Sequence, residues 1–134
     1  MNHRRSNVVS MVMLGLALGP GAAVPSIAQP SAGAAQEIDH MLAYVEASGC
    51  GFFRNGSWYD AKRALDHLRV KYDYLKSGIA SSEEFIERAA TKSSLSGQPY
   101  LVRCGAGEPV ASGAWLMNEL ARYRHASAHA TVAN

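Results

Sequence analysis

A histidine, two serines and a carboxylate are the residues of this sequence whose types could perform catalysis. His67 follows Asp66 directly, and Ser94 and Ser96 lie further along the chain. A histidine that takes the proton of a serine hydroxyl, with a carboxylate to orient the ring, is the arrangement of acyl-transfer hydrolases. The spacings G-x-S-x-G and Ser-x-x-Lys, which place such serines, do not occur here. The sequence therefore favours a protein without catalytic function, and a small hydrolase centred on His67 and a loop serine is the alternative.

Aromatic and basic residues point instead to a binding surface. In the helix that we predict from Ser57 to Ser77, one apolar stripe contains Trp58, Ala61, Leu65, Leu68, Tyr72 and Leu75. A second stripe lies nearly opposite and contains Tyr59, Arg63, His67, Val70 and Tyr74. Two such stripes indicate a helix covered on both sides, or a helix whose second face binds a ligand.

The segment SSLSGQPYLVRC, residues 93–104, adds a loop rich in hydroxyl groups. Serine hydroxyls in such a loop cap backbone amides, and Gly97 supplies a positive φ angle. The stretch from Ser96 to Tyr100 is also similar to the S-G-x-x-Y loop of periplasmic lysozyme inhibitors, which are β-barrels. Inhibition of an envelope hydrolase is thus a further alternative. The candidate binding residues are Arg54, Asn55, Tyr59, Arg63, His67, Tyr74, Ser93, Ser94, Ser96, Gly97 and Tyr100.

The sequence gives no reason to expect a cofactor or a metal. Gly105 and Gly107 lack the third glycine of a dinucleotide-binding loop. The acidic residues of the helix that starts near Ser81 do not have EF-hand spacing.

Two cysteines, Cys50 and Cys104, are present. In an exported protein the expected state of such a pair is a disulfide. A zinc site and a nucleophilic cysteine are the competing hypotheses, although no C-x-x-C or paired-histidine spacing supports zinc.

The N-terminus predicts export. Arg4 and Arg5 precede an uncharged apolar stretch that ends before Ser26-Ile27-Ala28, a pattern typical of a secretory signal peptide cleaved after residue 28. The apolar stretch is too short to span a membrane as a helix, so we expect a soluble product without a membrane span. Residues 29–35, rich in Pro, Ser, Gly and Ala, are predicted to be a flexible tether.

Charge excludes one class of partner. Of the 13 basic residues, Arg4 and Arg5 lie in the predicted leader, and the other 11 balance the 11 acidic residues. Nucleic-acid binding calls for a basic excess or patch, so we do not expect it. An envelope protein or a cell-wall component is the expected partner.

The elements that would position these residues form a small, mainly helical domain at 36–124, followed by a disordered tail at 125–134. Ile38, Met41, Leu42 and Val45 give the first helix, Gln36 to Ser48, one apolar face. Ser81 and Glu84 start a third helix by a capping box, and a fourth carries Trp115, Leu116, Leu120 and Tyr123 on one face. Extended segments at 50–54 and 99–104 would be clamped side by side by the disulfide. The fold class is therefore α+β, with about four helices and two short strands.

The order of these segments is identifiable. The runs FFRNGSWYDAKRALDHLRVKYDYL and EEFIERAATKSSLSGQPYLVRC resemble the YfeK-like bacterial exported proteins, a family known as domain of unknown function 5329. The resemblance extends from about Ile38 to Tyr123. It implies a small periplasmic protein with a signal peptide, and it implies no activity or catalytic residue.

Overall fold

The computed structural model describes residues 19, 21–24 and 28–133. Most of the predicted signal peptide, residues 1–28, lies outside the described residues. Within the described part of the chain, no helix combines the length and the apolar composition needed to cross a membrane.

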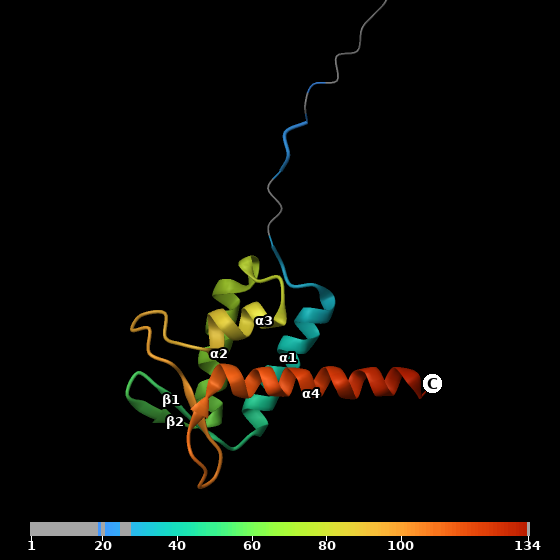
Figure 1. Cartoon of the computed structure of the whole chain (residues 1–134). Coiled ribbons are helices and arrows are strands. Elements are labelled where there is room, and N and C mark those ends of the chain that lie inside the picture. Colours follow the sequence, from blue (N-terminus) through green and yellow to red (C-terminus); the bar gives the residue numbers. More distant parts are fainter. Residues whose placement is uncertain (1–18, 20, 25–27, 134) are drawn as a thin grey trace, which may run out of the picture.

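Four α-helices make up most of the domain (Figure 1). They are α1 (Ala32–Ala47), α2 (Ala61–Leu75), α3 (Ser82–Phe85) and α4 (Ser112–Val132). A 3₁₀ turn, η1 (Lys76–Gly78), follows α2, and a π-helical turn, η2 (Ile86–Ala90), follows α3. The mainly helical class predicted from the sequence is confirmed.

A small antiparallel sheet lies at one end of the helices. Its strands are β1 (Gly51–Arg54), β2 (Ser57–Tyr59), β3 (Leu101–Arg103) and β4 (Val110–Ala111), in the order β2-β1-β3-β4. The two predicted extended segments are the central strands β1 and β3, which pair with Phe52 opposite Val102. The edge strands β2 and β4 are additions that the sequence analysis did not predict.

The start of α2 is a correction. Ser57 was expected to cap this helix, but Ser57 pairs with Arg54 in a hairpin, and Asp60 is the cap, accepting a bond from the backbone N–H of Arg63 at 2.8 Å. The reason is the two-residue turn: Asn55 and Gly56 have φ angles of 48° and 86°. Two successive positive φ angles return the chain antiparallel to itself, so the next three residues continue the sheet.

The disulfide is confirmed. Cys50 and Cys104 are bonded, with their Cα atoms 4.4 Å apart. They directly flank Gly51 and Arg103, which face each other across β1 and β3. Because the bond closes a loop with a sequence separation of 54 residues, the chain-entropy argument gives a stabilisation of about 4 kcal/mol.

The core fills the space between the helices and the inner face of the sheet. All four residues that the sequence places on the apolar face of α1 are buried, and so are Leu65 and Leu68 of α2. The largest fully buried side chains are Phe85, Ile38, Met41, Leu65, Ile79, Leu116 and Leu120. Trp58, assigned to the same stripe as Leu65, is instead in β2 and 39% exposed.

Both ends of the domain differ from the predicted boundaries. α1 begins at Ala32 because the Ser31 hydroxyl accepts from the backbone N–H of Ala34, so it includes part of the predicted tether. α4 continues through Val132, over most of the tail predicted to be disordered. That segment is rich in alanine, the strongest helix former. Its end projects from the body of the domain (Figure 1).

Candidate functional site

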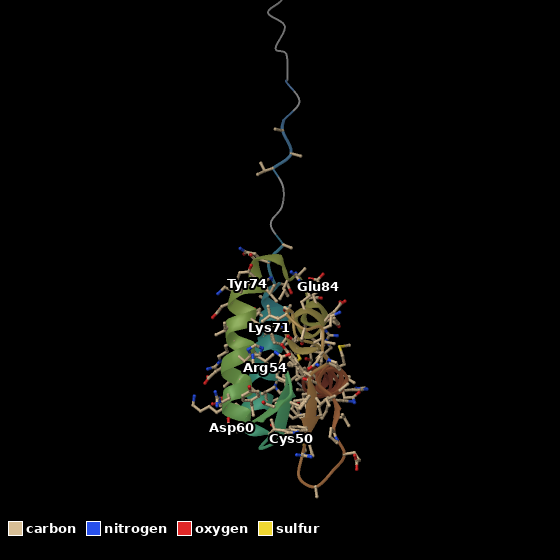
Figure 2. All side chains as sticks on the ribbon, turned by 90° about the vertical axis from the view of Figure 1, so that its left-hand side faces the viewer. Cys50, Arg54, Asp60, Lys71, Tyr74 and Glu84 are labelled. Carbon is tan, nitrogen blue, oxygen red and sulfur yellow. A yellow bond between two sulfur atoms is a disulfide. The ribbon has the colours of Figure 1, made fainter. Side chains whose placement is uncertain are left out.

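A pocket of about 330 Å³ opens between α2 and the β1–β2 hairpin. Phe52, Phe53 and Leu68 supply apolar surface, while Arg54 and Arg63 supply positive charge. Figure 2 shows Arg54 beside α2, in the stretch of that helix between Asp60 and Tyr74. The volume of the pocket is at the lower end of the range for small-molecule sites.

His67 lies at the centre of a polar chain along this pocket. Its Nδ1 is 3.0 Å from Nη1 of Arg54, and its Nε2 is 3.2 Å from the hydroxyl of Tyr100. Arginine can only donate, so Nδ1 must accept and the proton of the neutral ring is on Nε2. His67 therefore donates to Tyr100, whose hydroxyl oxygen also lies 3.5 Å from Nζ of Lys71.

The electrostatics of the pocket agree with a neutral ring. Burial, followed by the charges of Arg54 and Lys71, lowers the pKa of His67 to about 4. Burial and then the charge of Arg54 also lower the pKa of Lys71. Burial raises the pKa of the Tyr100 hydroxyl. The region is thus partly dehydrated and positive.

Tyr59 joins the two arginines. The guanidinium carbon of Arg54 is 5.1 Å from the centre of the Tyr59 ring, and that of Arg63 is 5.2 Å away. Among the ion pairs of the described residues, none includes Arg54 or Arg63. Asp66 lines the pocket but pairs with Lys62 at 3.1 Å. Both guanidinium groups are therefore available to an anion.

The serine-rich loop contacts the hairpin that forms one side of the pocket. The Ser93 hydroxyl accepts from the backbone N–H groups of Leu95 and Ser96, and Gly97 has a φ angle of 72°. The Ser96 hydroxyl donates to Oδ1 of Asn55 at 2.7 Å. The loop thus has the turn chemistry that its composition predicts, and it is tied to the β1–β2 hairpin.

Comparison with known proteins gives the family. A family model described as "Family of unknown function (DUF5329)" matches residues 32–124. The chain belongs to the DUF5329 family. The match begins at the first residue of α1 and includes every residue of the pocket, but it ends before the last turns of α4.

A curated bacterial protein is also similar to this chain. The chain is 33% identical over 78 residues to a Salmonella typhimurium LT2 protein described as "Uncharacterized protein YfeK". The aligned part is 58% of this chain and 65% of the relative. No solved structure matches the chain. The YfeK-like resemblance expected from the sequence is confirmed, and it carries no assigned activity.

The structure of this DUF5329 protein distributes the candidate binding residues over three places. Arg54, Tyr59, Arg63, His67 and Tyr100 line the pocket. Asn55, Ser93, Ser96 and Gly97 lie in the hairpin turn and in the serine-rich loop bonded to it, outside the pocket lining. Ser94 is exposed outside the pocket lining, and Tyr74 is 85% exposed beyond it.

Sequence reasoning missed two polar residues of this site. Lys71 follows His67 by four positions, so the helical repeat places the two side chains on one face, and this signal was available. Ser112, the first residue of α4, lines the pocket because its backbone N–H donates to the carbonyl of Tyr100 at 3.0 Å. That contact depends on the pairing of β3 with β4, which no local sequence pattern predicts.

The contacts of His67 bear on the hydrolase alternative. Within the described residues, Nδ1 of His67 is hydrogen-bonded to Arg54 and Nε2 is hydrogen-bonded to Tyr100. No serine hydroxyl bonds to His67 in this part of the chain. A general base needs a free lone pair and a pKa near the working pH. The His67 lone pair accepts from Arg54 instead, so the geometry does not favour this alternative. The described residues also contain no cluster of three or more His, Cys, Asp or Glu side chains suited to a metal ion.

Proposed function

We propose that this protein is a non-catalytic binding module of the bacterial cell envelope and that it holds its partner in the pocket between α2 and the β1–β2 hairpin. The observation that carries this proposal is the pair of guanidinium groups, Arg54 and Arg63, at an apolar pocket without a carboxylate partner among the described residues. A few polar groups that converge on an apolar hollow are typical of binding sites.

We further propose export to the periplasm. The leader pattern of residues 1–28 and the bonded cysteines support it, because structural disulfides persist in oxidising compartments. The alternative of an envelope-hydrolase inhibitor that uses the Ser96-Gly97 loop stays a prediction.

Photo-crosslinking in intact cells tests the binding role. A photoreactive amino acid replaces Val70, which lines the pocket and is 69% exposed, and in a control protein it replaces Met117 of α4, which is 42% exposed outside the pocket lining. We expect a discrete adduct from the Val70 position and none at the same mass from the Met117 position.

A second substitution makes the result specific. Arg63→Gln in the Val70 protein should remove the adduct, whereas Arg69→Gln, an exposed residue of the same helix outside the pocket lining, should leave it. An adduct that survives Arg63→Gln, or that forms equally from Met117, would contradict the proposal. Cell fractionation before crosslinking tests the location.

A further inference from the structure

The charges around the pocket indicate what kind of ligand it takes. Arg54, Arg63 and Asp66 are the charged residues that line it. Asp66 already pairs with Lys62, so its carboxylate does not neutralise the arginines. Arg54 and Arg63 therefore present their positive charge to a ligand that carries an anionic group.

Arg54 is the strongest part of this argument. It is partly buried, and its only hydrogen-bonding partner among the described residues is the neutral ring of His67. A charge withdrawn from water is costly unless an opposite charge meets it. The remaining N–H groups of its planar fork match the two oxygens of a carboxylate.

Much of the rest of the lining is apolar and continues outwards. Phe52, Phe53 and Leu68 line the pocket, and Val70 lies at its exposed rim. Tyr74, one helical turn after Val70, is 85% exposed. An apolar group can therefore fill the pocket while a longer chain continues along α2.

Ser112 offers one more polar group. This residue is only 5% exposed, lines the pocket, and has a hydroxyl without a hydrogen bond among the described residues. Its backbone N–H is already bonded to Tyr100. The hydroxyl can bond a polar atom of the ligand.

We infer that the pocket binds a carboxylate carried on an apolar group, presented as the C-terminus of a peptide. This inference rests on the proposed function and names the ligand chemistry of the same pocket. The carboxylate meets Arg54 and Arg63, the last side chain packs on Phe52 and Leu68, and the preceding residues follow Val70 towards Tyr74.

Calorimetric titration of the full chain, as purified from expressing cells, tests the inference. The probe is the pentapeptide acetyl-Gly-Ala-Ala-Ala-Phe with a free carboxyl terminus, compared with its C-terminal amide, with acetylphenylalanine and with inorganic phosphate. We expect the free acid to bind about tenfold or more tightly than the amide, since a hydrogen bond to a charged group is worth that much. The peptide acid should also bind more tightly than acetylphenylalanine and phosphate.

Arg63→Gln should weaken binding of the free acid by about tenfold or more and leave the amide unchanged, while Arg69→Gln should alter neither. Arg63 is exposed, so the folded state should persist, and unchanged thermal melting verifies it. Equal binding of acid and amide, no binding of either, or tighter binding of phosphate would overturn the inference. Acetylphenylalanine that binds as tightly as the peptide acid would overturn the peptide part.

The two proposals can fail separately. If the Val70 crosslink depends on Arg63 but the free acid does not bind, the ligand chemistry is wrong and the binding role stands. If the acid binds but no crosslink forms in cells, the pocket chemistry stands and the envelope role is wrong.

Discussion

Nη1 of Arg54 lies 3.0 Å from Nδ1 of His67, and this contact holds the histidine in the tautomer that carries its proton on Nε2. A positive group thus donates to a residue that is normally protonated in mild acid. Several consequences can be measured.

The first consequence concerns protonation of His67. Its pKa is lowered from 6.5 to about 4, so the unfolded chain binds a proton between these pH values and the folded chain does not. Stability from this group is complete above pH 6.5 and is lost as the pH falls towards 4. The urea midpoint of the wild type should fall more steeply between pH 6.5 and 5 than that of His67→Gln. Parallel profiles would contradict the assignment.

Three glutamates affect stability only in more acidic solution. A hydrogen bond from an arginine is the first cause that lowers the pKa values of Glu37, Glu83 and Glu119. Their contribution to stability is therefore lost only as the pH falls below about 4.5.

Removing the neighbouring charge should move the same titration. In Arg54→Ala, the pKa of His67 should rise, because the second-largest cause of its lowering is gone. It should stay below 6.5, since burial is the largest cause. NMR titration of the His67 ring measures both shifts, and Arg69→Ala is the control for loss of an arginine from the α2 surface. An unmoved His67 titration in Arg54→Ala would show that the contact is not made in solution.

The disulfide should account for a large part of the stability. Replacement of both Cys50 and Cys104 by alanine is expected to lower the free energy of unfolding by about 3 to 4 kcal/mol. Urea denaturation measures this loss, and the wild type treated with a reductant should show a similar one. A loss below about 1 kcal/mol would mean that the bond contributes little to the fold. Alkylation of the unreduced wild type should label neither Cys50 nor Cys104.

The cap of α2 can be assigned by two single substitutions. Asp60→Ala should cost about 1 kcal/mol, because the backbone N–H of Arg63 loses its acceptor. Ser57→Ala should change stability by less than about 0.5 kcal/mol, because Ser57 lies exposed in β2 and caps nothing. A larger loss of stability in Ser57→Ala than in Asp60→Ala would show instead that Ser57 caps the helix, as the sequence pattern predicts.

Local patterns were sufficient for most helices. The apolar face of α1 is buried as its spacing predicts, and the Ser81 hydroxyl caps α3 through Glu84. Glu84 completes the box one residue earlier than expected, by accepting from the backbone N–H of Ala80. These features depend on residues three or four apart, where the sequence is informative.

The sheet and the site depend on contacts between distant residues. Arg54, His67 and Tyr100 could each be selected by type, but their meeting follows from the pairing of β1 with β3 and the position of α2. Tyr74 was selected from the helical pattern, but it does not line the pocket. It shares a helical face with His67, yet seven residues separate them by about 10 Å along the axis, so Tyr74 lies beyond the pocket.

The bond between Cys50 and Cys104 has a consequence for recognition. It clamps β1, which carries Arg54, to β3, which directly follows Tyr100, so two sides of the pocket are held by one covalent frame. A ligand would enter a preorganised cleft and would not have to order the backbone. The heat-capacity change of association should therefore reflect only the apolar area that the ligand covers, without the additional contribution of coupled folding.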